Sequence, residues 1–283
     1  MKILVFGKNG QVGRELTKMP HVLALDRSVA DLSVPGACAR AIAEAEPDLV
    51  INAAAFTAVD KAEAEVRLAQ RINGEAPGEM ARACAALGRP FLHVSSDYVF
   101  DGSGRAARRE TARCKPINTY GHSKLEGEEA VIAAAGRWGI LRTSWVFSAH
   151  GQNFVRTILR LSDTRAELQV VEDQIGGPTP AADIARALMC IGRAMVGGHP
   201  GGLYHFSGQP PTSWAGFARE VFARTGRQVS VTGIASSGYP TPAARPLNSR
   251  LDCRKIAEDF GLRAPDWKAG LDKVLAEMEG VTT

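Results

Sequence analysis

The stretch that decides the fold reads Ile3-Leu4-Val5-Phe6-Gly7-Lys8-Asn9-Gly10-Gln11-Val12-Gly13. An apolar run of strand length leads directly into Gly7, Gly10 and Gly13, and a segment of helical periodicity follows. Glycines at this spacing allow a tight turn, a close approach of the backbone to a pyrophosphate, and close packing of helix against strand. The free N–H groups at the start of the helix favour an anion. The spacing differs from the usual Gly-x-Gly-x-x-Gly, but its position directly after the first strand predicts a dinucleotide-binding loop.

Short apolar runs and longer amphipathic segments alternate through the first half of the chain. Buried strands are expected at residues 3–6, 22–25, 49–51, 91–94 and 139–142. Helices are expected at about residues 11–19, 36–46, 60–88 (with a break near Gly74 and Pro77) and 120–135. This alternation predicts βαβ units, and therefore an α/β fold with a doubly wound, Rossmann-type parallel sheet.

The character of the sequence changes after residue 145, where loops rich in glycine and proline appear. Further helices are expected near residues 153–162, 181–195 and 213–225, and a strand near 203–206. We expect residues 1–145 to form a dinucleotide-binding domain and residues 146–283 to form mainly a smaller, loop-rich, substrate-binding domain. Parts of about residues 178–208 are expected to return to the first domain.

Composition excludes several classes of protein. The net charge is +4, and the chain has no basic run interleaved with aromatic residues, so we expect no nucleic-acid partner. The five cysteines are far apart and never spaced as Cys-x-x-Cys, which argues against a disulfide framework or a zinc site and favours a reducing compartment. The apolar run at residues 3–6 is too short for a signal peptide, and no apolar run is long enough to cross a bilayer. We therefore expect a cytoplasmic protein without a membrane partner.

The residues after the second and third strands bear on the choice of cofactor. Asp26 lies where an acid bonds an adenosine ribose, which favours NADH, whereas Arg27 can accept a 2′-phosphate, which favours NADPH. Both cofactors therefore stay open. Asp31, followed by Leu32, either contacts the adenine or caps a helix. The small residues of 52–55 allow a cofactor to lie against the backbone.

A tyrosine and a lysine at helical spacing suggest carbonyl reduction. Tyr120 and Lys124 are four residues apart at the start of a predicted helix, so both side chains lie on one face. A free tyrosine, with a pKa of about 10, is a weak acid near neutral pH, but a neighbouring ammonium stabilises its phenolate. Ser96, at the end of the fourth strand, is positioned to donate to a substrate oxygen.

Seven segments, in chain order, resemble the dTDP-4-dehydrorhamnose reductase family of the extended short-chain dehydrogenase/reductase superfamily. They are residues 6–13, 52–63, 93–102, 120–124, 141–147, 173–179 and 245–252. The resemblance runs from residue 1 to about residue 267. The stretch 95–102 and the Asn-Ser-Arg-Leu motif at 248–251 are more specific than the glycine loop, because neither is general to dinucleotide folds.

The resemblance implies a reaction, the reduction of the C4 ketone of dTDP-4-dehydro-L-rhamnose to dTDP-L-rhamnose. By the same resemblance Tyr120 is the proton donor, Lys124 lowers its pKa and binds the nicotinamide ribose, and Ser96 polarises the C4 oxygen. A threonine is common at the position of Ser96, and serine keeps the hydroxyl.

The glycine loop and the resemblance together imply two sets of contact residues. The cofactor positions are Gly7, Gly10, Gln11, Val12, Gly13, Asp26, Asp31, Leu32, Ala55, Phe56, Thr57, Val94, Tyr120 and Lys124. The positions for a nucleotide-sugar substrate are Ser96, Asp97, Tyr120, Trp145, Asn153, Asn248 and Arg250. Structural roles stay open for five of these residues. Trp145 could be part of the core, Asp97 a turn residue and Asn153 a helix N-cap, while Asn248 and Arg250 could hold a loop.

The resemblance also bears on a metal ion and on the oligomeric state. Some members of the family dimerise through a magnesium ion held by glutamates; Glu15 matches one of these, but Ala182 occupies the place of a second. A C-terminal acid has no clear counterpart. Since a hard cation needs several oxygen ligands, we expect no metal requirement, while a metal-free homodimer remains open.

Two other functions also remain open. One is a nucleotide-sugar epimerase or dehydratase of the same superfamily, which uses extra acid and base residues; no Asp-Glu pair of the dehydratase kind follows Ser96. The other is a non-catalytic, nucleotide-binding regulatory subunit, against which the intact Ser/Tyr/Lys set counts.

Overall fold

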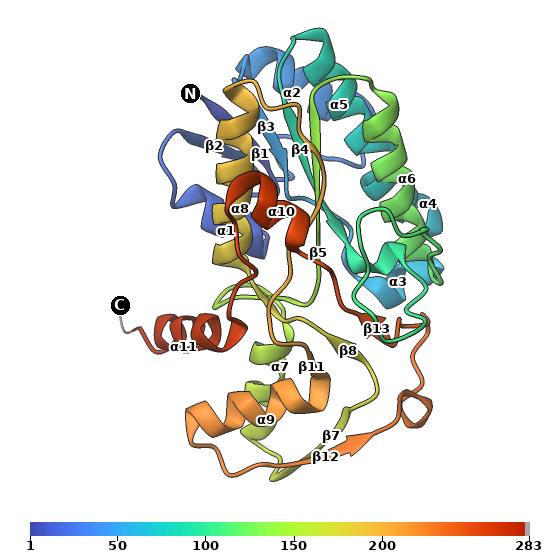
Figure 1. The fold of residues 1–283 in the computed structure, drawn as a ribbon, viewed down its shortest axis with the longest axis vertical. Coiled ribbons are helices and arrows are strands. Elements are labelled where there is room, and N and C mark those ends of the chain that lie inside the picture. Colours follow the sequence, from blue (N-terminus) through green and yellow to red (C-terminus); the bar gives the residue numbers. More distant parts are fainter. Residues whose placement is uncertain (281–283) are drawn as a thin grey trace.

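A six-stranded parallel sheet forms the centre of the molecule (Figure 1). In the computed structural model, which describes residues 1–280, its strands lie in the order β10-β5-β4-β3-β1-β2. They are β1 (Ile3–Phe6), β2 (Val22–Leu25), β3 (Leu49–Asn52), β4 (Phe91–Ser96), β5 (Trp138–Thr143) and β10 (Gly202–His205). Because β2 and β3 lie on opposite sides of β1, the chain changes direction there, and such a switch point opens a crevice at the carboxyl ends of the strands. The predicted doubly wound α/β class is confirmed.

Helices cover both faces of this sheet. One layer contains α1 (Gln11–Thr17), α8 (Ala181–Val196) and α10 (Arg254–Phe260), and the other contains α2 (Ala37–Ala45), α5 (Ala76–Ala86) and α6 (Thr119–Ala133). Side chains alternate along β1, so Ile3 and Val5 pack in the first layer while Leu4 and Phe6 pack in the second. All four are fully buried, which explains why the run contains no polar residue.

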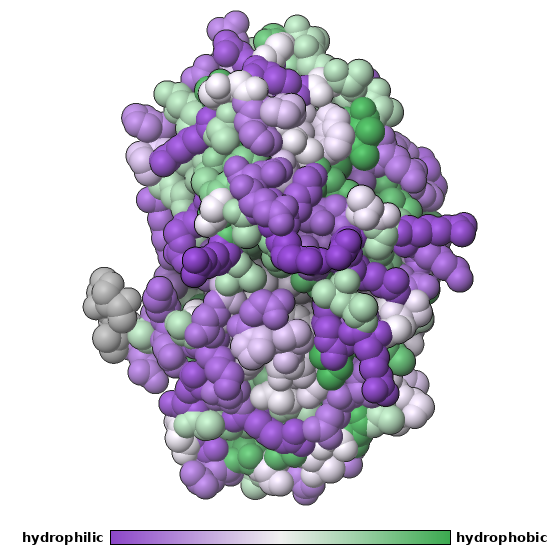
Figure 2. Space-filling view, viewed as in Figure 1, coloured by the Kyte–Doolittle hydropathy of each residue, from purple (hydrophilic) through white to green (hydrophobic). Residues whose placement is uncertain are grey.

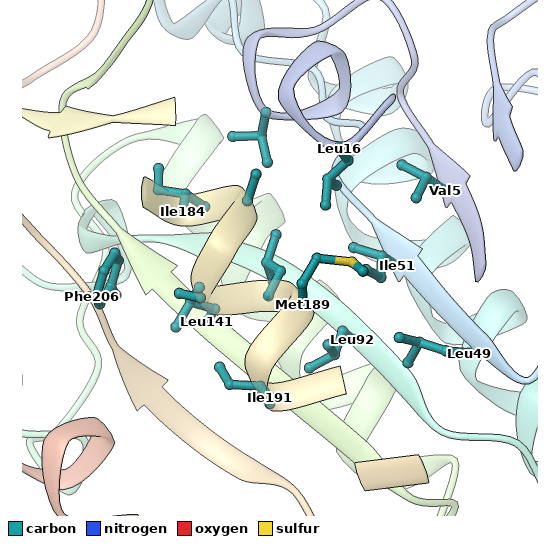
Figure 3. Packing of buried hydrophobic residues seen from close by; sticks show 14 of the residues in the cluster. Val5, Leu16, Leu49, Ile51, Leu92, Leu141, Ile184, Met189, Ile191 and Phe206 are labelled. Carbon is teal, nitrogen blue, oxygen red and sulfur yellow. The ribbon is translucent and has the colours of Figure 1, made fainter. Parts of the chain in front are cut away.

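Figure 3 shows the first layer at close range. Ile184, Met189 and Ile191 of α8 lie over the sheet, where they meet side chains such as Leu92 and Leu141. β10 follows α8 in the chain and pairs in parallel with β5. The chain therefore leaves the sheet after β5, builds another region, and comes back to cover and extend the sheet.

The region predicted as one helix at residues 60–88 is four helical segments. They are α3 (Val59–Ala64), α4 (Val66–Gln70), the π-helical turn η1 (Arg71–Glu75) and α5. Pro77 explains the wide turn, because its nitrogen cannot donate to the carbonyl of Asn73 and its ring disturbs the regular helix there. That freed carbonyl approaches α6 so closely that a Cβ on Gly127 would overlap it. The first break falls at Glu65, which leaves the helical conformation (φ −112°, ψ 47°), rather than near Gly74.

Residues after β5 build a second hydrophobic core below the sheet in Figure 1. Phe147 and Phe217 meet there at 5.3 Å between ring centroids, and Phe217 also contacts Trp267. The elements of this part of the chain are β6 (Val146–Phe147), α7 (Phe154–Ser162), β7 (Glu167–Val171), β8 (Ile175–Gly176), β9 (Thr179–Pro180), β11 (Thr212–Ser213), α9 (Trp214–Thr225), β12 (Ser230–Ile234), η3 (Ser236–Gly238), β13 (Asn248–Ser249) and α11 (Trp267–Met278). A further 3-10 turn, η2 (Asp97–Val99), follows β4.

One face of the molecule is mainly polar. On the face drawn in Figure 2, hydrophilic residues dominate and apolar residues are scattered among them. No helix within residues 1–280 combines the length and the apolar character that crossing a bilayer would demand.

Candidate active site

A cavity of about 810 Å³ opens at the carboxyl ends of the central strands. The glycine loop, the ends of β2 to β5, the start of α6 and the start of α9 contribute to its wall. The predicted site residues in its lining are Gly7, Gly10, Gln11, Val12, Asp26, Asp31, Leu32, Ala55, Phe56, Thr57, Val94, Ser96, Asp97, Tyr120, Lys124 and Trp145. The fold thus brings the predicted cofactor positions and the predicted catalytic positions to one cavity of a size suited to small ligands.

The glycine loop is shaped to hold an extended anion. Gly7 has φ +97°, which a residue with a side chain rarely adopts, and a Cβ there would stand 2.8 Å from the nitrogen of Ala54. A Cβ on Gly13 would overlap the carbonyl oxygen of Gly7, so Gly13 packs α1 against the loop from behind the cavity. Gly10 is less crowded, since a Cβ there would meet the carbonyl oxygen of Gly7 at 3.3 Å and no other close atom of the described residues. These residues fit the pyrophosphate of a dinucleotide.

Charged residues gather at the far end of the cavity, beside β2. The Ser28 hydroxyl donates to Asp26 Oδ1 at 2.6 Å and lowers the pKa of that carboxyl. Arg27 donates through Nε to Asp31 at 2.9 Å, which leaves its outer nitrogens exposed. Lys8, from the glycine loop, lines the same end and adds a second cation. This end therefore offers both a carboxylate for ribose hydroxyls and two cations for a phosphate.

Ser96 and Asp97 lie where β4 ends and η2 begins. Ser96 Oγ accepts from the nitrogen of Tyr98 at 3.2 Å and donates to Asp97 Oδ1 at 3.1 Å. Asp97 is buried, and its Oδ2 has no hydrogen-bond partner among the described residues. Burial raises the pKa of Asp97 to about 6, although hydrogen bonds from Ser249 and Ser96 lower it. A buried carboxyl oxygen without a partner, in the wall of a cavity, is available to a ligand.

Tyr120 is held at the start of α6. The Asn118 side chain caps this helix by accepting from the nitrogen of Gly121 at 2.7 Å, and it also donates to the carbonyl of Ala244. Tyr120 is 9% exposed, and its ring packs edge-on against Tyr98 at 5.4 Å between centroids. Burial raises the pKa of Tyr120 to about 12, although the nearby Ser96 hydroxyl lowers it. In this arrangement burial outweighs the acidifying effect that the sequence predicts from the lysine.

Lys124 is buried one turn further along α6. Its Nζ lies 2.7 Å from the carbonyl of Val94 and 3.1 Å from Nε2 of His93. Burial lowers the pKa of Lys124 to about 8, although nearby Glu128 raises it. The lysine is therefore attached to β4, in the lining of the cavity that Tyr120 also lines.

Two tryptophans form one wall of the cavity. Trp145 and Trp214 stack with 3.6 Å between ring centroids and 11° between planes. Trp145 has φ +48°, a strained backbone for a bulky residue, and the absence of a side chain at Gly176 leaves room for its indole. The Trp214 nitrogen donates to Gln174 at 3.2 Å. A flat aromatic wall of this kind suits the apolar face of a sugar ring.

Three predicted substrate residues, Asn153, Asn248 and Arg250, lie outside the lining of this cavity. Asn153 caps α7 by accepting from the nitrogen of Arg156 and donates to the carbonyls of Ser148 and His150. Asn248 donates to the carbonyl of Ala106 at 2.8 Å and accepts from Nη1 of Arg250 at 3.0 Å. Both asparagines therefore use their polar atoms to hold loops, and Asn248 also orients Arg250.

One cluster among the described residues has the spacing of a metal site. Glu15, His150 and Glu277 of α11 bring ligand atoms within 4.8 Å of one another. Lys18 donates to Glu15 and to Glu277, the latter at 2.8 Å, so an ammonium already balances the two carboxylates. Glu277 is a C-terminal acid beside Glu15, although the sequence alone suggested no clear counterpart for one.

Comparison with known proteins assigns the family. The family model described as RmlD substrate binding domain matches residues 1–279. A dTDP-4-dehydrorhamnose reductase of Sinorhizobium fredii is 46% identical, over 95% of this chain and 94% of that protein. The chain belongs to the dTDP-4-dehydrorhamnose reductase family.

Solved structures of this reductase family agree with the fold. A dTDP-4-dehydrorhamnose reductase of Clostridium acetobutylicum superposes with a TM-score of 0.93 at 36% identity, over 99% of this chain and 100% of that one. One from Bacillus anthracis, solved in complex with NADP, gives a TM-score of 0.92 at 32% identity, over 98% and 100% of the two chains.

Three cavity features of this family member were missed by sequence reasoning. Trp214 of α9 is part of the cavity wall, and Lys8 lines the end of the cavity beside β2. The Asn73 side chain holds the loop at Phe56: it accepts from the Phe56 nitrogen at 2.8 Å and donates to the Phe56 carbonyl at 3.0 Å. Lys8 lies inside the glycine loop, so its position was a usable signal. Trp214 and Asn73 lie in helical segments where nothing local distinguishes them from packing residues.

Proposed function

We propose that this chain reduces the C4 ketone of dTDP-4-dehydro-L-rhamnose to dTDP-L-rhamnose, with NADPH or NADH as the reductant. The observation that carries the proposal is the convergence of Ser96, Tyr120 and Lys124 on the cavity that the glycine loop also lines. The name of the 46% identical relative supports the choice of substrate.

The proposed chemistry divides among the side chains of the cavity. When bound, the reduced nicotinamide supplies the hydride. Tyr120 gives its hydroxyl proton to the oxygen of the former ketone, and Ser96 donates a hydrogen bond to that oxygen. Lys124 binds the nicotinamide ribose and, as an ammonium, stabilises the phenolate that Tyr120 becomes.

The cofactor-binding role rests on the glycine loop and the charges beside β2. The pyrophosphate would lie along Gly7 to Gly13, and the residues 55–57 would contact the nicotinamide half. Lys8 and Arg27 would hold the 2′-phosphate of NADPH, and Asp26 the ribose hydroxyls of NADH. The complex of the Bacillus anthracis relative with NADP supports the first of these.

The substrate-binding role divides between the wall and the loops. Asp97 and Trp145 hold the sugar, with the free Oδ2 of Asp97 accepting from a sugar hydroxyl. Arg250 is our candidate for the diphosphate: burial and another cation, Arg105, lower its pKa, and an anion would offset both effects. Asn153 and Asn248 serve substrate binding indirectly, through the loops that they hold.

The proposal extends to the domain organisation, the cellular location and the assembly of the protein. Residues 1–145, with parts of about 178–208, bind the cofactor, and most of 146–283 binds the nucleotide sugar. We propose a cytoplasmic protein, with a homodimer as the candidate assembly.

The test is a spectrophotometric assay with purified protein, the dTDP-keto-sugar and either cofactor. A fall in nicotinamide absorbance that depends on the sugar supports the proposal, and no fall with either cofactor rejects it. Tightly retained NAD and sugar conversion without net oxidation would indicate an epimerase or dehydratase instead. Cofactor binding without any turnover would indicate a regulatory subunit.

A further inference from the structure

A chain of buried polar groups runs from the floor of the cavity to the catalytic lysine. The nitrogen of Ala54 donates to Asn52 Oδ1 at 3.0 Å, and Asn52 Nδ2 lies 3.2 Å from His93 Nδ1. His93 Nε2 lies 3.1 Å from Lys124 Nζ, which also donates to the carbonyl of Val94 at 2.7 Å. Asn52 and His93 are fully buried and Lys124 is 1% exposed, so water does not share in these bonds.

Parallel pairing of β3 and β4 creates this chain. Asn52 and His93 are direct partners in the ladder, so their side chains leave the sheet next to each other on one face. Lys124 reaches down from α6 onto the same strand. The contact between the three residues therefore depends on the fold and on no local sequence feature.

The donors and acceptors in this series of polar groups can be assigned by starting from the Ala54 N–H. The Ala54 N–H is a donor, so the Asn52 group facing it is the carbonyl oxygen, and the amide NH₂ faces His93. His93 Nδ1 must then accept. An uncharged imidazole carries one N–H, so this proton is on Nε2 and points at Lys124 Nζ. An ammonium has no lone pair to receive it, whereas an amine has one.

The other assignments each oppose two donors in a buried place. With Lys124 as an ammonium, Nε2 must accept and the Nδ1 proton meets the Asn52 NH₂ group. Turning the Asn52 amide over removes that clash but sets its NH₂ against the Ala54 N–H. A charged imidazole is disfavoured because burial holds the pKa of His93 well below its usual value.

We infer that His93 is a positioning residue that holds Lys124 as an uncharged amine in the free protein, and that Lys124 takes up one solvent proton when a nicotinamide ribose binds. The inference rests on the proposed nicotinamide-dependent reduction. Ribose hydroxyl oxygens supply the acceptors that an ammonium needs and that His93 does not offer. The Lys124 proton leaves again when the cofactor is released, and the proton that Tyr120 gives to the product is replaced from solvent.

The other charges around Lys124 do not replace this control. Glu128, on the same helix, forms a buried pair with Arg142 of β5, so its charge is largely balanced. Tyr120 lines the cavity and is uncharged, because its pKa is raised to about 12. Asp97 also lines the cavity; its pKa is about 6, so it does not change charge in the range where the lysine titrates. The helical segments on the other side of α6 hold their charges in pairs of their own, such as Arg71 with Glu79. Burial already lowers the pKa of Lys124 to about 8, and the His93 N–H acts in the same direction.

The tautomer of His93 can be measured directly in the free protein. Nitrogen-15 NMR of the histidine rings distinguishes a protonated from an unprotonated ring nitrogen. We expect Nε2 protonated and Nδ1 unprotonated at neutral and mildly alkaline pH. A protonated Nδ1 would overturn the inference. This measurement needs no cofactor, substrate or variant, so it stands apart from any failure of the proposed function.

Proton uptake on cofactor binding is the second test. Calorimetric titration with NADH in buffers of different ionisation enthalpy, at about pH 9, should show uptake close to one proton per site, because that pH lies above a free-state pKa of about 8. In His93→Gln the amide oxygen can accept from the ammonium, so we expect the lysine pKa to rise and uptake to fall below that of the native protein, although burial still lowers that pKa. Binding by the native protein without uptake, or equal uptake in His93→Gln, would contradict the inference.

The chain offers a matched control. His205, at the end of β10, is also a fully buried imidazole; its Nδ1 lies 3.0 Å from the carbonyl of Arg108 and its Nε2 3.4 Å from Arg142, and neither nitrogen bonds to Lys124. His205→Gln makes the same substitution in the same sheet. We expect its proton uptake to equal that of the native protein; a drop matching that of His93→Gln would show a general effect of losing a buried histidine and would overturn the assignment. If neither variant nor native protein binds a nicotinamide cofactor, the proposed function fails while the NMR result still decides the tautomer.

Discussion

The indole of Trp145 lies flat on the indole of Trp214, with 3.6 Å between ring centroids and 11° between planes. The two residues come from different parts of the fold, since Trp145 follows β5 of the central sheet and Trp214 begins α9 of the second core. The stack therefore fixes the position of the second core at the cavity wall. It also supports the strained backbone of Trp145.

Removing the Trp214 ring should weaken sugar binding. In Trp214→Ala, Trp145 loses its support, and we expect KM for the keto-sugar to rise roughly fivefold, in line with about 1 kcal/mol for an aromatic pair. The cofactor dissociation constant, measured by nicotinamide fluorescence, should stay unchanged. Trp214→Phe keeps a flat ring and should restore most of the loss. An unchanged KM in Trp214→Ala would remove the stack from substrate binding.

Tyr120→Phe should separate chemistry from binding. It keeps the ring contact with Tyr98 but removes the proton donor, so we expect kcat to fall by about 10² to 10⁴ while cofactor affinity holds. Steady-state kinetics and cofactor titration measure the two effects. Tyr204→Phe, a buried tyrosine that bonds Asp259 away from the cavity, is the control and should keep its kcat. Equal activity of Tyr120→Phe and the native protein would exclude Tyr120 as the acid.

Arg27→Ala should change cofactor choice. The exposed guanidinium is one of two cations at the ribose end, and its loss should weaken NADPH binding about tenfold or more, as for other hydrogen bonds to charged groups. NADH, without the 2′-phosphate, should be affected much less. Arg40→Ala, on α2 outside the cavity lining, is the matched control. The same loss for both cofactors would place Arg27 in a general electrostatic role.

The buried Asp97 should lower the free energy of unfolding at neutral pH, although it serves sugar binding. Its pKa is raised from 3.8 to about 6 by burial, so the folded state binds more protons and stability falls as pH rises through that window. Above about pH 6 the loss is about 3 kcal/mol, from about two pKa units. Asp97→Asn should therefore be more stable than the native protein to urea at pH 7 and less active.

Asp101→Asn provides a contrast of opposite sign. Hydrogen bonds from Ser103 lower the pKa of Asp101, so its ionised form is favoured by folding and its replacement should not stabilise. A stability gain of similar size in both variants would mean that the Asp97 effect is not due to burial.

Glu128 should be structural. Its carboxylate bonds Arg142 at 2.8 Å and 2.5 Å, and both side chains are 3% exposed. Glu128→Gln leaves a buried guanidinium poorly balanced, so we expect a loss of about 3–5 kcal/mol in the free energy of unfolding. Glu172→Gln, which breaks the exposed pair with Arg219, should cost less than about 1 kcal/mol. Similar losses in the two variants would contradict the distinction.

The central sheet was predictable because short apolar runs of strand length alternate with longer helical stretches along the chain. The position of the glycine loop in the cavity wall was predictable too, since the loop directly follows β1. The segment 60–88 was less predictable: Pro77 marks the π turn, but the earlier break at Glu65 has no glycine or proline to signal it. Strands such as β8 and β13, each two residues long, leave no periodic signal at all.

For the site, spacing on one helix was enough to bring Tyr120 and Lys124 together, and strand ends were enough to place Ser96. Asn52 and His93 belong to separate sequence motifs, and their contact was not predictable because it is made by strand register. Asn153 and Asn248 illustrate the reverse. An asparagine suits a loop bond or a sugar contact equally well, and only the partner atoms tell the two apart.

The return of the chain to the sheet through α8 and β10 limits how this molecule can be divided. A fragment ending at residue 145 would lack both α8 and α10, so that only α1 would remain on the side of the sheet that these helices cover. Replacing the second core with that of a relative while keeping the central sheet thus requires junctions at several places at once. To exchange this region between two relatives, several separate segments must be replaced together. A chimera with a single junction would join two parts whose buried surfaces do not match.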